Sequence, residues 1–88
     1  IFMDINELIA NVKKKLEKQI NIENIKIEDK TFLHKKHLNF QEGKFHLKIT
    51  LESIELKRLN RIESNKKIYK ILDYELKEYI HSIQIIIR

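Results

Sequence analysis

The chain has 88 residues, a formal net charge of +5, and neither cysteine nor tryptophan. This length supports one small domain with one hydrophobic core, so we expect a single domain over residues 1–88. Without cysteine the chain can form no disulfide and supply no thiolate, so a soft metal site would need thiolates from another molecule. No apolar run approaches the roughly 18 residues of a membrane span, and we expect no membrane association.

The positive charge comes mainly from lysine. Lysine supplies 15 of the 18 basic residues, and arginine occurs only at positions 58, 61 and 88. Bidentate contacts to phosphate and guanine favour the planar fork of arginine. This balance therefore favours a solvated basic surface over a nucleic-acid interface.

A first helix is predicted from Asp4 to about Ile20. Asp4 and Glu7 have the spacing of a capping box, and Met3 can pack on Leu8 as a hydrophobic staple. The lysines of this segment lie away from its apolar side. The apolar residues that share one helical stripe are Ile5, Leu8, Ile9, Val12, Leu16 and Ile20.

Two strands are predicted next. Residues 24–29 ("NIKIED") alternate, residues 30–43 follow no period, and residues 44–51 alternate strictly. The second strand thus has one buried and one wet face, and we expect His46 on the solvent side of the sheet. The apolar face carries Phe45, Leu47, Ile49 and Leu51, and the polar face carries Lys44, His46, Lys48 and Thr50.

The remaining chain predicts a short helix, a longer helix and a third strand. "SIELKRLNRI" is typical of a short helix, Ser64 is the expected N-cap of a helix that runs to Tyr79, and residues 81–87 form an apolar strand. The resulting αββααβ order predicts an α/β chain of the α+β two-layer sandwich type, with helices packed on one face of a three-stranded mixed sheet. The inward residues of the long helix are predicted to be Ile68, Ile71, Leu72, Leu76, Tyr79 and Ile80.

Catalytic patterns are missing from this sequence. It has no cysteine nucleophile, no glycine-rich turn around a serine and no phosphate-binding loop, since Gly43 is the only glycine. Glu28 and Asp29 are adjacent on a predicted strand and therefore point to opposite sides, which does not suit an acid–base pair. We expect a protein that is not an enzyme and has no catalytic residue.

Three histidines are candidates for metal binding. His34 and His37 lie in the predicted loop, and His81 opens the last predicted strand. Imidazole is a common ligand of transition metals. A loop HxxH is no specific signature, however. The residues alone favour solvated roles for the loop histidines and local hydrogen bonding for His81.

Four stretches together resemble the BolA-like family: "IKIEDKTFLH", "KFHLKITLES", "NKKIYKILDYEL" and "YIHSIQI". Asp29 to His34 matches the family's loop entry, Phe45 its second strand, and Ile80 with His81 its final signature. The match covers nearly the whole chain, so the single domain expected over residues 1–88 is BolA-like, with the order of elements of that family and a similarity to type II KH domains. The long helix matches at Ile68, Tyr69, Leu72, Glu75 and Leu76.

The sequence departs from the family pattern at three places. Ser64 and Asn65 replace an "RH" pair before the long helix, Lys44 replaces the histidine of the second-strand "HF", and the glycine of the preceding "FxG" stretch is missing. The two positions that the family uses for metal binding are retained as His34 and His81.

The resemblance implies a non-enzymatic partner of monothiol glutaredoxins that acts in iron–sulfur cluster assembly or transfer, or in iron regulation. Its heterodimer with a glutaredoxin would share a [2Fe–2S] cluster, held by a glutaredoxin cysteine and glutathione on one side and by histidines of this chain on the other. His81 would be the principal ligand, His34 the second ligand and His37 its substitute. Alone, the chain is expected to be a monomer without a cluster.

The resemblance also implies either the cytoplasm or the mitochondrial matrix. "HSIQIIIR" is closer to the mitochondrial branch of the family, and "IKIEDKT" is closer to the cytosolic branch. The first residue, Ile1, fits either a native start at Met3 or cleavage of an upstream segment.

The alternative function is that of a nucleic-acid-binding transcriptional regulator. Some BolA proteins have this role, and the two-helix region of this chain carries basic residues that resemble a helix-turn-helix surface. Against it, the chain lacks the GxxG loop of KH domains, and its lysines are not interleaved with aromatic residues. The candidate nucleic-acid-binding residues are Lys57, Arg58, Arg61, Lys66, Lys67 and Lys70.

Overall fold

A computed structural model describes residues 3–31 and 44–88 of the chain, so His34 and His37 lie outside the described residues. No helix within these two ranges is long and apolar enough to cross a membrane. The elements are α1 (Ile5–Gln19), β1 (Asn24–Asp29), β2 (Phe45–Glu52), α2 (Ile54–Lys57), α3 (Arg61–Ile71), α4 (Asp73–Glu78) and β3 (Ile80–Ile87).

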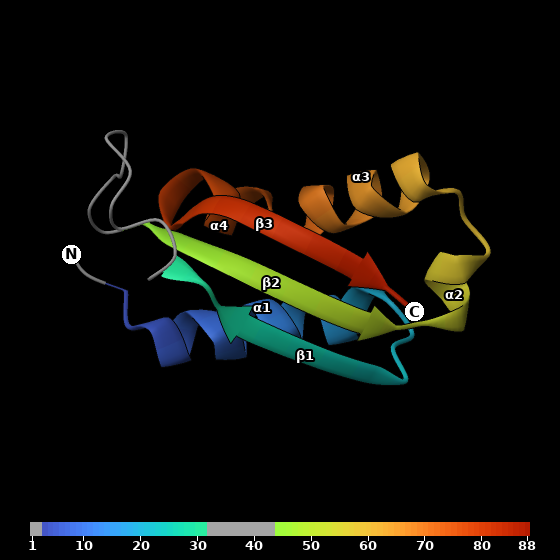
Figure 1. Ribbon diagram of the computed structural model, residues 1–88, viewed down its shortest axis with the longest axis horizontal. Coiled ribbons are helices and arrows are strands. Elements are labelled where there is room, and N and C mark those ends of the chain that lie inside the picture. Colours follow the sequence, from blue (N-terminus) through green and yellow to red (C-terminus); the bar gives the residue numbers. More distant parts are fainter. Residues whose placement is uncertain (1–2, 32–43) are drawn as a thin grey trace.

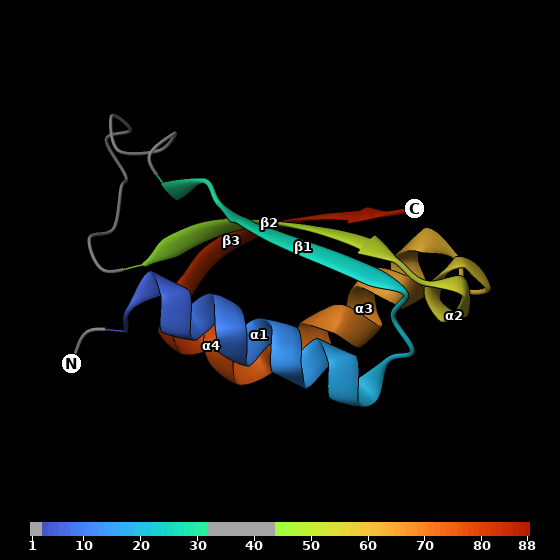
Figure 2. The same ribbon diagram turned by 90° about the horizontal axis from the view of Figure 1, so that it is seen from below.

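The three strands form one mixed sheet in the order β1–β2–β3. β1 pairs with β2 in antiparallel fashion, and β2 pairs with β3 in parallel. A parallel pair needs a crossover connection, which the segment of α2, α3 and α4 supplies. α1, α3 and α4 lie on one face of the sheet, and no helix of the described residues lies on the other face, which we call the open face (Figure 1, Figure 2). The predicted two-layer α+β architecture is confirmed.

α1 forms because its apolar stripe faces the sheet. Leu8, Val12 and Leu16 are fully buried, and the bounds of the helix agree with the predicted range. Asp4 takes the N-cap position with an extended backbone, but its side chain makes no cap hydrogen bond. The predicted capping box is therefore wrong. This helix is stabilised by packing of its apolar stripe and not by a capping box.

The core lies between the sheet and the helices. Alternation along β2 directs Leu47, Ile49 and Leu51 toward the helices, where each is at most 2% exposed. Burying one such side chain contributes about 1.5–3 kcal/mol. A slip of one residue would expose the whole set, so this face fixes the register of the sheet. The other core residues are Leu8, Val12, Leu16, Ile20, Leu56, Ile68, Leu72 and Ile80.

The long C-terminal helix differs from its prediction in two ways. Its N-cap is Asn60, not Ser64: the Asn60 side-chain oxygen accepts a hydrogen bond from the Glu63 N–H at 2.8 Å, and the Asn60 amide donates to the Glu63 carboxylate. This reciprocal cap starts the helix earlier and leaves Ser64 buried inside α3, where its hydroxyl donates to the Arg61 carbonyl. The helix also bends at Leu72, where φ is −96° and ψ is 17°, and continues as α4.

After the bend, a buried carboxylate on α4 contacts α1. Glu75 is 4% exposed, and its two carboxylate oxygens lie 3.0 and 2.8 Å from Lys15 Nζ. Breaking such a pair would leave a buried charge without compensation. The Lys15–Glu75 pair therefore fixes α4 against α1.

α2 is a single turn that joins three segments at one end of the molecule. The buried Ser53 hydroxyl accepts a hydrogen bond from the Leu56 N–H at 3.2 Å and donates to the Asn21 carbonyl at 2.8 Å. Glu55 accepts from the Asn21 N–H at 3.0 Å and pairs with Lys67 at 2.7 Å. The hydrogen bond from Lys67, followed by that from Asn21, lowers the pKa of the Glu55 carboxyl below its usual value.

Replacing Glu55 by glutamine is expected to destabilise the protein at pH 7, with a difference that shrinks as the pH falls. The pKa of Glu55 in the folded state lies below the unfolded-state value of about 4.3. Its carboxylate thus stabilises the fold above pH 4.3, and this contribution is lost as the pH falls through the folded-state pKa. Urea unfolding of wild type and Glu55→Gln from pH 7 down to pH 3 measures the effect. A difference that stays constant over this range would contradict the contacts described for Glu55.

Candidate functional site

Parallel pairing places the first residues of β2 and β3 at the same end of the sheet. Because β1 runs antiparallel to β2, the last residues of β1 reach this end as well. Residues 29–31, 45–46 and 80–82, which are distant in sequence, therefore lie close together. Every chemical feature of the candidate site follows from this meeting of three segments.

The start of β3 contains a β-bulge. Phe45 pairs with Ile80, but the next residue of β2, His46, pairs with Ser82, so His81 is one extra residue in β3. In a bulge, two residues of one strand oppose a single residue of the other strand. His81 and Ser82 thus both oppose His46.

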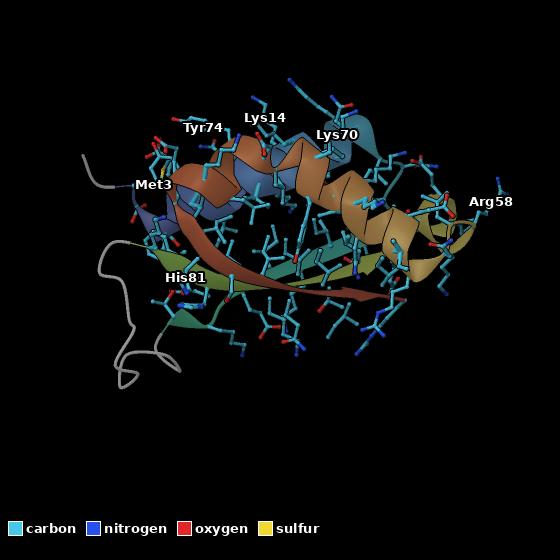
Figure 3. All side chains as sticks on the ribbon, turned by 90° about the horizontal axis from the view of Figure 1, so that it is seen from above. Met3, Lys14, Arg58, Lys70, Tyr74 and His81 are labelled. Carbon is cyan, nitrogen blue, oxygen red and sulfur yellow. The ribbon has the colours of Figure 1, made fainter. Side chains whose placement is uncertain are left out.

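Both residues contact the His46 ring. The ring centres of His46 and His81 are 4.9 Å apart, and the two ring planes are inclined by 60°. His46 Nδ1 lies 2.6 Å from the Ser82 hydroxyl oxygen. His81 and Ser82 are exposed, whereas His46 is 5% exposed. We call these three residues the histidine cluster, and Figure 3 shows its accessible member, His81, at the end of the sheet where β2 begins.

His46 lies on the predicted face of the sheet, but the expected exposure to solvent is wrong, because the residue is buried. Its side chain does leave the face that the helices cover, as alternation requires, because Phe45 and Leu47 pack toward the core. The residue is nevertheless buried, and its ring contacts His81 and Ser82. Alternation identifies the face of a sheet on which a residue lies, but not what covers that face at the end of a strand.

The end of β1 fixes the backbone of His46. The His46 N–H donates to the Thr31 hydroxyl oxygen at 3.1 Å, and the His46 carbonyl accepts from the Lys30 N–H at 2.7 Å. Thr31 is held in turn by Asp29, whose Oδ1 accepts from both the N–H and the hydroxyl of Thr31. These bonds hold the His46 backbone at the end of β1.

A groove of about 470 Å³ on the open face adjoins the histidine cluster. Two of its lining residues, Lys30 and Lys48, are cationic. Lys30 Nζ lies 3.1 Å from the Glu28 carboxylate, and this contact lowers the pKa of Glu28 below its usual value. The groove offers space and positive charge for an anionic group of a partner. Its lining consists of Lys30, His46, Leu47, Lys48, Ser82, Ile83 and Gln84.

Of the predicted metal ligands, His81 lies within the described residues. The roles of His34 and His37 stay predictions. Within residues 3–31 and 44–88, no group of three or more histidine, cysteine, aspartate or glutamate side chains is arranged to hold a metal ion. His46 was not among the predicted ligands. Its proximity to His81 could have been inferred from the parallel pairing of two strands that begin at neighbouring positions in the sheet.

The candidate nucleic-acid-binding residues lie along α2 and α3. α2 has only four residues, which is too short for the first helix of a helix-turn-helix motif. Lys67 is paired with Glu55. Figure 3 shows Arg58 at the opposite end of the molecule from His81, so the two candidate surfaces are separate. The exposed members of the set are Lys57, Arg58, Arg61, Lys66 and Lys70.

Comparison with known proteins gives consistent similarities. The family model described as BolA-like protein matches residues 16–88. The DNA-binding transcriptional regulator BolA of Haemophilus influenzae is 26% identical over 72 residues, which cover 82% of this chain and 67% of that protein.

Solved structures with the same fold include the BolA domain of SufE1 from Arabidopsis thaliana, with a TM-score of 0.77 and 24% identity. The match covers 90% of this chain and 87% of that domain. BolA1 from Arabidopsis thaliana has a TM-score of 0.75 and 20% identity, again over 90% of this chain and 87% of the other. At these identities the structural likeness establishes the fold.

Thr31→Val is expected to destabilise the protein by about 1 kcal/mol, because valine cannot accept the hydrogen bond from the His46 N–H. Thr31→Ser keeps the hydroxyl and is the matched control. Amide hydrogen exchange measured by NMR should show faster exchange at His46 in Thr31→Val than in Thr31→Ser. Equal exchange rates in the two variants would refute the anchoring of β2 by the end of β1.

Proposed function

The chain belongs to the BolA-like protein family, and on this premise we propose that it is a non-enzymatic partner of monothiol glutaredoxins. The two proteins form a heterodimer around a shared [2Fe–2S] cluster, to which this chain contributes His81. The observation that carries the proposal is the exposed imidazole of His81, which a β-bulge presents at the end of the sheet where three segments meet.

The donors of this chain fit an iron site that another molecule completes. A [2Fe–2S] cluster needs two ligands on each iron, and in some proteins two histidines serve one of the irons. Imidazole suits iron, and the chain has no cysteine to offer. In the proposal, the glutaredoxin cysteine and the thiolate of glutathione hold one iron, and histidines of this chain hold the other.

Replacing thiolates by neutral imidazoles makes the cluster less negative and raises its reduction potential. A cluster with such a mixed ligand set is suited to transfer between proteins or to sensing iron. We therefore place the function in iron–sulfur cluster assembly or transfer or in iron regulation, in the cytoplasm or the mitochondrial matrix.

Charge and access support docking of a second protein at this end of the sheet. Within residues 3–31 and 44–88 no helix lies on the open face (Figure 2), and the groove beside the histidine cluster contains Lys30 and Lys48. The net charge of +5 attracts an acidic surface and accelerates association with it. A glutaredoxin with an acidic rim around its thiolates would match this face.

Adding the chain to a cluster-loaded monothiol glutaredoxin with glutathione is expected to change the visible absorption and circular dichroism of the cluster. His81→Ala should abolish the change because it removes the principal ligand. Asn11→Ala, an exposed substitution on α1 outside the groove lining, is the control and should behave as wild type. A spectrum that wild type leaves unchanged, or that His81→Ala alters equally, would exclude the proposal.

The alternative, a nucleic-acid-binding regulator, is favoured by one observation. The Haemophilus influenzae relative is named a DNA-binding transcriptional regulator. The exposed basic residues of α2 and α3 would supply phosphate contacts. Against it stand the single-turn α2 and the ion pair that engages Lys67.

At physiological salt we expect the chain to bind duplex DNA with a Kd no tighter than about 10⁻⁶ M and without sequence preference, as for non-specific charge attraction. Fluorescence anisotropy across a salt series and several duplexes measures this. Tighter binding that depends on sequence and is lost in the Arg58→Ala/Arg61→Ala double variant would favour the regulator.

A further inference from the structure

The two outer edges of the sheet differ in charge. β1 and β3 are the outer strands (Figure 1). β1 carries charged side chains at Lys26, Glu28 and Asp29, whereas β3 includes no lysine, arginine, aspartate or glutamate. Charged residues on an outer strand are one of the usual means by which proteins prevent a further strand from pairing with it. β1 is therefore protected against strand addition, and β3 is not.

Alternate backbone groups of β3 point away from the sheet. The Arg88 N–H donates to the Leu51 carbonyl of β2 at 2.7 Å. Because the N–H and C=O groups of successive residues in a strand point to opposite sides, those of Ile83, Ile85 and Ile87 point toward the outer edge. Within residues 3–31 and 44–88, these backbone groups have no hydrogen-bond partner. They form a template on which an added strand can pair.

A groove of about 430 Å³ runs along this edge. Its lining includes the consecutive residues Ile85, Ile86 and Ile87, whose side chains alternate between the two faces of the sheet, so the groove follows the edge and not one face. The opposite wall comes from α2, from α3 and from the segment between them. Ile85 and Ile87 are only partly buried, so an added strand would cover apolar surface as well as backbone groups.

The charge of the groove favours an acidic occupant. Lys57 and Arg61 line it together with apolar and neutral residues, and neither cation forms an ion pair within the described ranges. A second copy of this chain matches the groove poorly, because its β3 carries no carboxylate and because two copies with a net charge of +5 repel each other. A segment whose carboxylates meet the two cations is attracted instead, and it associates faster.

We propose that the outer edge of β3 binds an extended segment of a partner protein, with alternating apolar residues and acidic ends, as a fourth strand of the sheet. Hydrogen bonds to the outward-facing backbone groups of β3 supply affinity, and the groove accepts alternate side chains of the segment. Figure 3 shows Arg58, the neighbour of Lys57, at the opposite end of the molecule from His81, so this site is separate from the proposed cluster site. The proposal does not depend on the cluster function.

Three labelled octapeptides test the proposal by fluorescence anisotropy with the whole chain. The first has six central residues that alternate valine with threonine, and a glutamate at each end. The second has lysine in place of both glutamates, and the third is the first peptide with N-methyl groups on its six central amides. The first peptide should bind, the second should bind about tenfold more weakly because like charges meet, and the third should not bind because it cannot donate to β3.

The double variant Lys57→Ala/Arg61→Ala should weaken binding of the first peptide by about 2–30-fold, the range expected for two exposed ion pairs. Lys13→Ala/Lys14→Ala is the matched control, because it removes the same charge from exposed positions of α1 outside the groove, and it should bind as wild type. Failure of the first peptide to bind, equal binding of the N-methylated peptide, or an equal loss in both double variants would overturn the proposal.

Amide hydrogen exchange measured by NMR locates the added strand. In the chain alone, the N–H groups of Gln84 and Ile86 should exchange slowly because they face β2, and those of Ile83, Ile85 and Ile87 should exchange fast. The first peptide should slow exchange at the three outward-facing residues. Unchanged exchange there with the peptide bound would contradict strand addition. Slow exchange at these residues in the chain alone, together with a doubled mass in sedimentation, would show that a second copy occupies the edge and would also overturn the proposal.

Discussion

The parallel pairing of β2 with β3 is the constraint on which the rest of the structure depends. It requires a crossover connection, which α2, α3 and α4 provide, and it brings the first residues of both strands to one end of the sheet. The helices of the crossover cover one face only, because the chain returns to the same side of the sheet (Figure 2). A single pairing thus accounts for the layer of helices, for the open face, and for the proximity of His46 to His81.

The two ends of the molecule are held by different chemistry. At the end that carries α2, hydrogen bonds and ion pairs of Ser53 and Glu55 join a single helical turn to its neighbours. At the end that carries the histidine cluster, a threonine hydroxyl and two imidazoles join three segments. The first set is rich in charge and stabilises the fold. The second set surrounds His81, the proposed cluster ligand.

Much of this arrangement was predictable from the sequence, because it depends on local periodicity. The apolar stripe of α1 and the alternation of β2 gave correct element types, and their order gave the correct architecture. Three features were not predictable in this way. The N-cap at Asn60 depends on a reciprocal bond with Glu63 that competes with the cap expected at Ser64, and no local pattern indicates the bend at Leu72. The buried His46 also contacts a residue 35 positions later in the chain, which alternation along one strand cannot reveal.

The roles of the candidate site residues stay predictions, and the structure adds where the described ones lie. Resemblance to a family indicated His81, which the structure places at an accessible position, whereas the role of His34 stays a prediction. His46 was assigned to the wet face because alternation describes one strand at a time. The register between strands, and the extra residue in β3, are properties of a pair of strands that no single-strand pattern contains.

The extra residue also separates two demands on β3 that would otherwise conflict. The isoleucines that follow the extra residue must alternate regularly to stay in the core. In a strand without a bulge, the same alternation would determine the face of the sheet on which every earlier residue lies. The bulge shifts the in–out alternation of β3 by one residue between Ile80 and Ser82. Both Ile80 and Ile83 therefore pack against the core, while the two consecutive polar residues between them face outward. His81 and Ser82 can therefore be exchanged for other residues without any change to the packing of the sheet on its helices.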